Sequence, residues 1–333
     1  MIIKYEELKA ILREKLIKLG ADENTAEITA TIISENDLDG ITSHGTGRFV
    51  RICEMIKLGK IKINNTAVKV SGKGSLEIWD GQTGPGPVNA QICMNRAMEL
   101  SESYGIGCVA LRNTNHWLRG ATYGIQAAKK GFVGICWTNT TPNMPAWGTK
   151  EACTGNNPIV FSVPYKDSYI VMDGALAQFS YGALGKAASN GKQMPVDGGY
   201  DSEGKLTTEP SEILKTRRVL PIGFWKGSGI SILLDMIVSG LSGGLCVPEI
   251  GELGSSTTDE RNLSQIFIAI KADRKTMDSK AESIISFIKN SEPAEENSPV
   301  YIPGEQSLKR QKIQSVEGII IDDSIWNGIE NRK

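Results

Sequence analysis

The sequence contains two histidines, and each is followed by an arginine within one helical turn. His44 precedes Arg48 in Ser-His-Gly-Thr-Gly-Arg, and His116 precedes Arg119 in Asn-His-Trp-Leu-Arg. A histidine exchanges a proton near neutral pH, and an arginine binds a carboxylate through two parallel hydrogen bonds. A lone histidine is usually structural, but the repeated pattern favours a functional role. Both motifs suit redox chemistry on a 2-keto or 2-hydroxy acid.

The composition favours an enzyme that acts on a small molecule. The 333 residues are 40% hydrophobic and 23% charged, which is typical of a globular chain of one large or two medium domains. Lys and Arg total 37 against 38 for Asp and Glu, so no basic field would hold nucleic acid or an acidic membrane. We therefore expect neither partner.

The sequence shows no targeting segment or metal-binding pattern. Its first residues carry charges and lack the apolar run of a signal peptide, and no later stretch is apolar enough to span a membrane. The cysteines are scattered without paired spacing, which predicts reduced core residues. A metal site is not expected. These features predict a cytoplasmic enzyme.

Three helices are predicted at the N-terminus, over residues 5–19, 22–38 and 44–58, from apolar residues that recur every three or four positions. Thr42 or Ser43 can cap the third helix, which would place His44 in its first turn and Arg48 one turn later on the same side. A helix N-terminus also attracts anions. We expect a substrate carboxylate between Arg48 and this turn, although capping alone would also explain Ser43.

Short β-rich runs follow, with one helix predicted over 88–104 and another after His116. The predicted strands lie at 68–70, 76–79, 108–111, 134–137, 159–163, 169–172 and 265–270. A helical C-terminal region is interrupted by Pro293 and Pro299. The predicted fold class is mixed α/β (α+β), with a helical N-terminal layer and a large mixed sheet flanked by helices.

This pattern also predicts how the chain is divided. We expect region 1–72 to pack with C-terminal helices in 275–333, and region 73–274 to form a mixed-sheet domain that binds cofactor and substrate.

The usual dinucleotide fingerprint is absent. Its nearest match, Gly-Pro-Gly-Pro-Val-Asn at 84–89, lacks the third glycine, and its prolines remove two amides. Gly-Ser-Gly at 227–229 is no phosphate loop either. A nicotinamide would have to bind on a non-Rossmann fold.

Seven motifs occur in a characteristic order. They are Ser-His-Gly-x-x-Arg at 43–48, Asn-His-Trp-x-Arg-Gly at 115–120, Trp-Thr-Asn at 137–139, Gly-x-Asn-Pro-Ile at 155–159, Met-Asp at 172–173, Trp-Lys-Gly-x-Gly at 225–229 and Pro-Gly-Glu at 303–305. This order resembles the malate/L-lactate dehydrogenase family over essentially the whole chain. The resemblance implies a non-Rossmann NAD(P)-binding fold and a homodimer.

The resemblance also implies catalytic and substrate-binding roles. His44 would donate a proton to the carbonyl oxygen during hydride transfer, because an imidazolium can quench the charge that develops there. Ser43 would orient His44, and Asp197 is a weaker candidate to hold the imidazole. Arg48 would bind the substrate carboxylate and His116 a neighbouring oxygen.

Cofactor contacts are implied in three segments. Their residues are Tyr169, Ile170, Val171, Met172, Asp173, Gly174 and Ala175, then Trp225 and Lys226, then Gly304, Glu305 and Gln306. Gly174 lets a backbone approach a ligand closely, and Lys226 can meet a phosphate. Taken singly, Asp173 could end a strand, Trp225 could be a core aromatic and Gly304 a loop glycine.

The expected cofactor is NAD, with NADH preferred and NADPH as the alternative. Residues 173–177 and 305–306 depart from the pattern of the most similar members, so this preference is open. We expect reduction of a 2-keto sugar acid. Alternatives are a sister dehydrogenase acting on malate, lactate, ureidoglycolate or a cyclic imino acid, and a catalytically silent sugar-acid binding protein.

Overall fold

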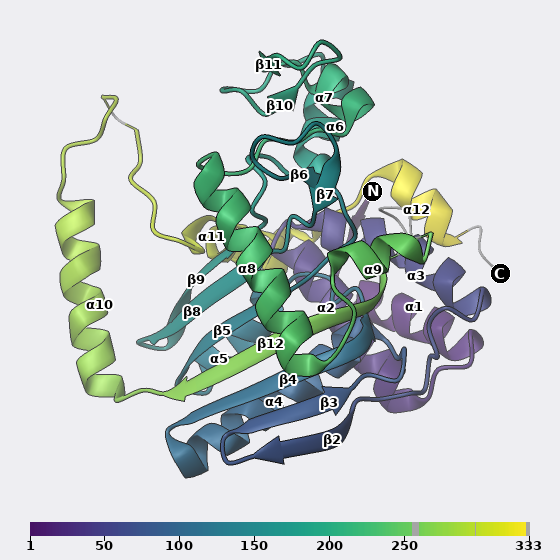
Figure 1. The fold of residues 1–333 in the computed structure, drawn as a ribbon. Helices are drawn as coiled ribbons and strands as arrows, with labels where there is room; N and C mark the ends of the chain where they lie inside the picture. The colour runs from purple at the N-terminus through teal and green to yellow at the C-terminus, as the bar shows by residue number, and fades with distance from the viewer. Residues whose placement is uncertain (255–259, 297, 331–333) are drawn as a thin grey trace.

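The computed structural model describes residues 1–254, 260–296 and 298–330. In this part of the chain, a seven-stranded mixed sheet runs through the centre in the order β2-β3-β4-β12-β5-β8-β9 (Figure 1). The strands are β2 (Val68–Lys73), β3 (Leu76–Asp80), β4 (Ile106–Asn115), β5 (Phe132–Thr138), β8 (Ile159–Tyr165), β9 (Ser168–Gly174) and β12 (Arg261–Lys271). Strands β3 and β4 are parallel, and the other neighbours are antiparallel. The predicted mixed α/β class is confirmed.

Alternation along the central strands divides the core between two faces of the sheet. In β4, Val109 and Leu111 belong to one buried cluster, and Ala110 between them belongs to the other. Helices α4 (Gly86–Tyr104) and α5 (Ala121–Lys129) pack against the first face. Helix α2 (Glu23–Leu38) packs on α4, and α1 (Tyr5–Lys18) packs on α2, so these two helices extend the same core outward. Helices α8 (Trp225–Ser242) and α9 (Val247–Glu252) lie on the opposite face (Figure 1).

Helix α8 has no counterpart among the predicted elements. Its 18 residues are largely apolar around the whole circumference, so they lack the one-sided stripe that marks an amphipathic helix. A small lobe before it was also not predicted. The lobe contains α6 (Tyr181–Ser189), β10 (Gly199–Tyr200), β11 (Leu206–Thr207) and α7 (Pro210–Thr216), at the top of Figure 1.

Strands β6 (Met144–Pro145) and β7 (Ala152–Thr154) form a separate two-stranded sheet. Further elements lie near the two ends of the chain: β1 (Ile2–Ile3), α10 (Arg274–Lys289), α11 (Glu305–Glu317), β13 (Ile319–Ile320) and α12 (Asp323–Glu330). Strand β1 pairs with β13, and α11 contacts α2. Helix α10 instead contacts β8. The expected boundary at residue 72 falls inside β2, and the division into two regions stays a prediction.

In the described part of the chain, no helix has both the length and the apolar character needed to cross a membrane.

Candidate active site

The first histidine lies in a turn before the third helix. Residues Thr42–His44 form a 3-10 turn, Gly45 follows, and α3 spans Thr46–Lys57. The prediction that His44 opens the helix is therefore wrong. The cap comes from α2 instead, because the Asp37 carboxylate accepts a hydrogen bond of 2.8 Å from the Thr46 N–H.

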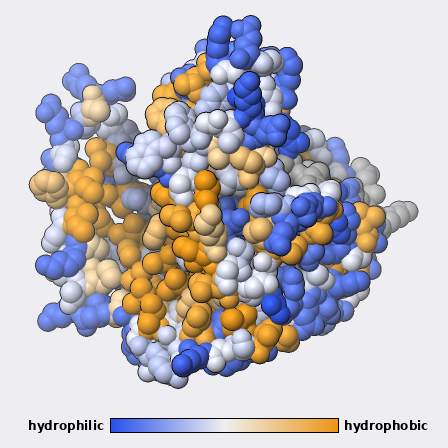
Figure 2. Space-filling model, viewed as in Figure 1, coloured by the Kyte–Doolittle hydropathy of each residue, from blue (hydrophilic) through white to orange (hydrophobic). Residues whose placement is uncertain are grey.

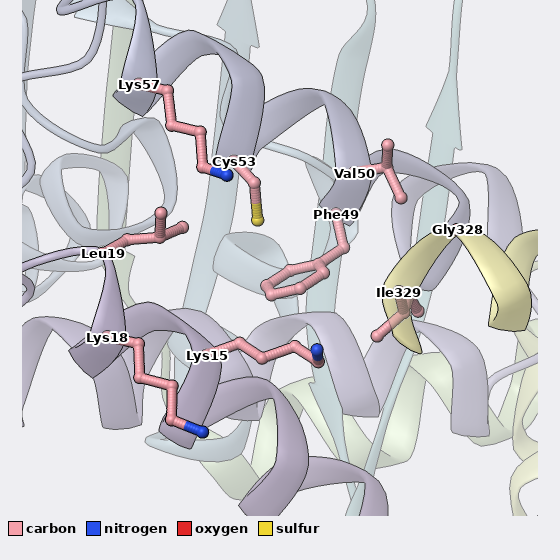
Figure 3. A pocket seen from close by; sticks show the side chains of 9 residues that line it. All are labelled: Lys15, Lys18, Leu19, Phe49, Val50, Cys53, Lys57, Gly328 and Ile329. Atoms are coloured by element: carbon pink, nitrogen blue, oxygen red, sulfur yellow. The ribbon is translucent and has the colours of Figure 1, made fainter. Parts of the chain in front are cut away.

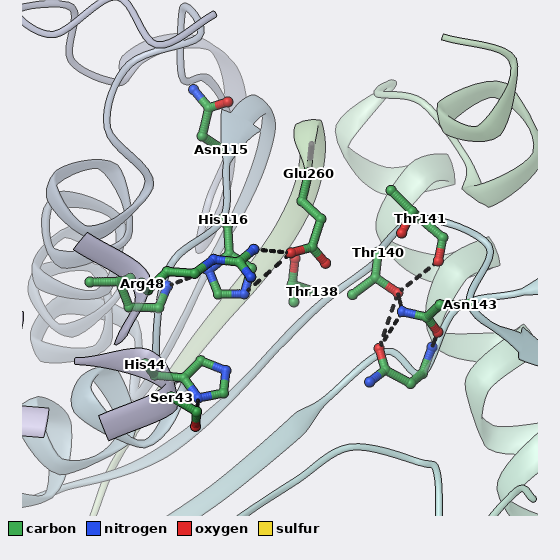
Figure 4. Close-up of polar contacts among 12 residues, drawn as sticks. Ser43, His44, Arg48, Asn115, His116, Thr138, Thr140, Thr141, Asn143 and Glu260 are labelled. Atoms are coloured by element: carbon green, nitrogen blue, oxygen red, sulfur yellow. Dashed lines mark hydrogen bonds and ion pairs between the residues drawn. The ribbon is translucent and has the colours of Figure 1, made fainter. Parts of the chain in front are cut away.

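This turn fixes His44 from two sides. Asn36 Nδ2 donates to the His44 carbonyl at 3.0 Å, and Ser43 Oγ lies 3.1 Å from His44 Nδ1. In Figure 4, Nδ1 faces Ser43, so the other ring nitrogen, Nε2, is directed away from it. The arrangement leaves Nε2 for a substrate.

The second histidine stands beside the first. His116 follows the last residue of β4, and its ring stacks on that of His44 with centroids 5.7 Å apart and planes at 18°. The Leu118 N–H donates to His116 Nδ1 at 3.1 Å, which makes Nδ1 an acceptor and places the ring proton on Nε2. Neutral His116 is thus a hydrogen-bond donor.

Helix α4 supports this position through Gly86. A Cβ at Gly86 would overlap the His116 carbonyl, so glycine lets the start of α4 pack against the backbone that carries the histidine. The proline-rich segment at 84–89, which lacks the dinucleotide fingerprint, is therefore a turn that leads into α4.

Both histidines are held in the neutral form. Burial lowers the pKa of His44 to about 4, and the nearby Arg48 and Arg119 guanidinium groups add to this effect. Burial, followed by the charge of Arg48, also lowers the pKa of His116. The unliganded site therefore contains two uncharged imidazoles at neutral pH.

The arginine of the first motif is paired with an acid that the motifs did not reveal. Arg48 Nη2 donates to Glu260 Oε2, and His116 Nε2 lies 3.6 Å from the same oxygen (Figure 4). Burial raises the pKa of Glu260, and Arg48 opposes that rise. Glu260 directly precedes β12, whose Arg261 pairs with Asn115, so sheet register places the acid beside His116.

The arginine of the second motif has a different partner. Arg119 forms a buried ion pair with Asp39, whose other carboxylate oxygen accepts from Gln311 of α11 at 2.9 Å. Both partners are buried, so this is not a surface ion pair. Arg119 thereby joins the end of α2 to the loop after β4.

Asp197 has no contact with His44 among the interactions of the described residues. It is exposed, in the loop between α6 and β10. Within the described part of the chain, His44 has Ser43 as its side-chain hydrogen-bond partner. The lobe reaches the turn through Gly182 instead, where a Cβ would lie 3.8 Å from Ser43 Cβ.

A second polar group follows β5. Asn143 Nδ2 donates to Asn156 Oδ1 at 3.1 Å, and the Asn156 N–H donates back to Asn143 Oδ1 at 2.8 Å. Thr140 Oγ1 also lies within hydrogen-bonding distance of this pair, whereas the buried Thr141 hydroxyl has no partner in the described part of the chain. Figure 4 shows Glu260 between this group and the histidines. Two motifs of the sequence lie at this group, Trp-Thr-Asn at 137–139 directly before Thr140 and Gly-x-Asn-Pro-Ile at 155–159 around Asn156, but neither predicted the group itself.

Two of the three expected cofactor segments meet at β9, and the third begins nearby. Gly304 has a φ of +85°, and a Cβ there would lie 3.0 Å from Val171. Ile222, shortly before Trp225, donates its N–H to the Leu176 carbonyl at 2.9 Å. Helices α11 and α8 therefore begin close to β9, where the positive end of each helix dipole suits the phosphates of a dinucleotide.

The side chain of Asp173 has a structural role in this region. Its carboxylate accepts from the Ala121 N–H at 2.8 Å at the start of α5. The backbone around Asp173 is thus the part left to meet a cofactor, and the residues fit a nicotinamide dinucleotide through glycine-lined backbone and helix N-termini.

One pocket lies away from these groups, between α1, α3 and α12 (Figure 3). Its lining residues are Lys15, Lys18, Leu19, Phe49, Val50, Cys53, Lys57, Gly328 and Ile329. It has an apolar floor and includes none of the expected site residues. The two histidines and Glu260 therefore lie outside this pocket.

Comparisons with known proteins identify the family of the chain. The family model described as malate/L-lactate dehydrogenase matches residues 3–330. The 2,3-diketo-L-gulonate reductase of Escherichia coli O1:K1 is 42% identical over 334 residues, covering 99% of each chain.

Two solved structures have the same fold. The sulfolactate dehydrogenase from Methanocaldococcus jannaschii superposes with a TM-score of 0.91 at 31% identity, covering 99% of this chain and 95% of that one. The malate dehydrogenase from Entamoeba histolytica gives 0.92 at 25% identity, covering 99% and 96%. With the family model matching nearly every residue, this chain belongs to the malate/L-lactate dehydrogenase family of oxidoreductases.

Proposed function

We propose that the protein reduces a 2-keto sugar acid with NADH, most specifically 2,3-diketo-L-gulonate to 3-dehydro-L-gulonate. The observation that carries this proposal is the junction of His44, Arg48 and His116 in one site. The 42% identical relative named for this reaction supports the substrate. The intact acid–base and carboxylate-binding groups argue against a silent binding protein.

Each side chain of the site has its own role in this reaction. Arg48 binds the substrate carboxylate with the guanidinium N–H groups that Glu260 leaves free, and His116 donates from Nε2 to an adjacent oxygen. A bound nicotinamide supplies the hydride to the keto carbon. His44 gives a proton from Nε2 to the oxygen, while Ser43 holds Nδ1.

The low pKa of His44 is compatible with this role. In the unliganded site burial and two arginines disfavour the imidazolium. A substrate carboxylate beside Arg48 and the charge that develops on the keto oxygen both favour it. His44 therefore acquires its proton as the anionic substrate binds, and it acts as the base in the reverse reaction.

A nicotinamide cofactor is expected from the family, and we assign NADH as the preferred form. Glu305 is the first residue of α11 and the charged residue of the Gly304–Gln306 segment. Its carboxylate pairs with Lys289 at 2.6 Å. Carboxylates accept hydrogen bonds from ribose hydroxyls and repel the extra phosphate of NADPH. We assign contact with the pyrophosphate to Lys226, a cation at the start of α8.

We assign a homodimer on the evidence of the molecular surface. Figure 2 shows apolar side chains gathered over α8, the neighbouring strands and α10. The exposed apolar residues there are Phe161, Met172, Ile230, Leu233, Met236, Ile237, Leu241, Ile284, Phe287 and Ile288. A patch of this kind is typical of a protein interface, and a second copy of the chain is our proposed occupant. The cytoplasmic location expected from the sequence stays a prediction.

The test is NADH oxidation, followed by absorbance, with 2,3-diketo-L-gulonate, pyruvate, oxaloacetate and a cyclic imino acid. The proposal expects the diketo sugar acid to give the largest kcat/KM. A larger value with oxaloacetate would favour the second candidate, a sister activity, which the malate dehydrogenase neighbour supports. No oxidation of NADH or NADPH with any of them would favour the binding protein.

A further inference from the structure

Glu260 has no role in the mechanism above, yet it contacts both groups that are assigned to the substrate. Its carboxylate is 9% exposed and receives Arg48 Nη2 on the oxygen that also lies 3.6 Å from His116 Nε2. A buried acid beside the carboxylate-binding arginine must either leave when substrate arrives or stay and contact it.

The backbone and the local charges favour an acid that stays. Glu260 directly precedes β12, whose first residue, Arg261, pairs with Asn115 of β4, so its backbone is held at the end of a central strand. Arg48 is the cation that pairs with Glu260 in the described part of the chain. Turning Arg48 away completely would leave a buried carboxylate without a partner, which is strongly unfavourable.

The site is then electrically balanced before substrate binds. Arg48 contributes one positive charge and Glu260 one negative charge, while the two imidazoles are neutral. Arg119 adds no net charge, because it is paired with Asp39. A monocarboxylate brings one negative charge, whereas a dicarboxylate brings a second charge toward a buried acid.

The remaining oxygen of Glu260 can also distinguish substrates that carry a hydroxyl group from those that carry a second carboxylate. Within the described residues, Oε1 has no hydrogen-bond donor, and Figure 4 shows the side chain between the histidines and the Thr140 side. An ionised carboxylate only accepts hydrogen bonds. It therefore suits a hydroxyl group on the carbons beyond the keto group and disfavours another carboxylate.

We propose that Glu260 is a specificity-determining residue, which selects hydroxylated monocarboxylic 2-keto acids and rejects dicarboxylic ones. This inference rests on the proposed reductase function, which it deepens by naming how the substrate class is chosen. Glu260 stays in place during turnover, accepts a substrate hydroxyl and repels a distal carboxylate.

The test compares kcat/KM for oxaloacetate with that for pyruvate in the wild type and in Glu260→Gln. In Glu260→Gln, Arg48 is no longer held by a charged partner, so it should bind the carboxylate of every substrate more tightly. This effect is the same for both substrates, and the ratio of their kcat/KM values cancels it. We expect the oxaloacetate-to-pyruvate ratio to rise at least about tenfold, because like-charge repulsion is removed. In Glu260→Met, which also lacks the acceptor, the ratio of 2,3-diketo-L-gulonate to pyruvate falls.

The matched control is Glu102→Gln, the same change at an exposed acid that pairs with Lys271, and it leaves both ratios unchanged. Unchanged ratios in the folded Glu260 variants would overturn the inference, because an acid displaced by every substrate predicts that result. Circular dichroism checks folding.

If the Glu260 variants do not fold, a measurement on the wild type still tests the inference. Malate should inhibit more weakly than 2-hydroxybutyrate, and equal inhibition constants would also overturn the inference. If the wild type reduces pyruvate and oxaloacetate but not 2,3-diketo-L-gulonate, the proposed function fails while the oxaloacetate-to-pyruvate ratio still decides the role of Glu260.

Discussion

The imidazole of His44 stacks on that of His116, with ring centroids 5.7 Å apart. Burial lowers the pKa of both rings, that of His44 to about 4. Charging either ring would place a cation against its neighbour and near Arg48, so the pair is neutral until an anion binds.

This neutrality predicts opposite pH profiles for the two directions of the reaction. Because kcat/KM reports the free enzyme, oxidation needs neutral His44 and should be level at neutral pH and fall as pH drops through about 4. Reduction needs the imidazolium, whose fraction declines about tenfold per pH unit above that pKa. Initial rates at several pH values check both, and a reduction profile that rises with pH would contradict the assignment.

Replacing the proton donor should affect turnover more than folding. We expect His44→Asn to lower kcat by roughly 100-fold or more, because general acid catalysis is lost. The melting temperature should stay near that of the wild type. Ser43→Ala is the milder companion, since it removes only the contact to Nδ1. Normal turnover in His44→Asn would rule out the proton-donor role.

The arginine should act mainly through binding. Arg48→Lys keeps the charge but cannot bind both Glu260 and a substrate carboxylate with the fork of a guanidinium. We expect KM for the keto acid to rise about tenfold or more, with a smaller change in kcat. Steady-state kinetics gives the two values separately, and a lower kcat at unchanged KM would contradict a binding role.

The turn that carries His44 should not tolerate a side chain at Gly45. A Cβ there would overlap the Asp37 carboxylate, which caps α3 through Thr46. Gly45→Ala should therefore destabilise the fold by about 1–3 kcal/mol and reduce turnover. Gly185→Ala in α6 is the control, because its Cβ would meet open space. Urea unfolding measures both, and equal effects would contradict this role for Asp37.

A charged residue introduced into the exposed apolar face tests the proposed homodimer. Leu233, on α8, is 58% exposed, and Leu233→Asp should convert the dimer to a monomer, as measured by light scattering during gel filtration. An acid buried in an interface without a partner disfavours association strongly. Leu58→Asp is the control, because this 63% exposed leucine follows α3 and lies outside the face. A wild-type monomer would reject the proposal.

The strands of the sheet were predictable because they alternate or form short apolar runs bounded by turns. All seven predicted strands are present, and helix 88–104 corresponds to α4. Helix α8 was missed because its apolar residues cover all sides, and the start of α3 was misplaced because its cap comes from Asp37, in α2. A cap supplied by another helix leaves no local signal.

The motifs indicated His44, Arg48 and His116 as site residues, and the structure brings these three together. Glu260 could not be found in the same way, because 144 residues of chain separate it from His116 and only the pairing of β12 with β4 makes them neighbours. Asp173 shows the reverse case, since its place in a motif did not reveal that its carboxylate caps α5.

The cap from Asp173 to the start of α5 joins two parts of the site. It ties the strand assigned to the cofactor to the loop that carries His116 and Arg119. On this assignment a dinucleotide bound along β9 steadies the loop that contacts the acid, so we expect each of the two ligands to raise the affinity for the other.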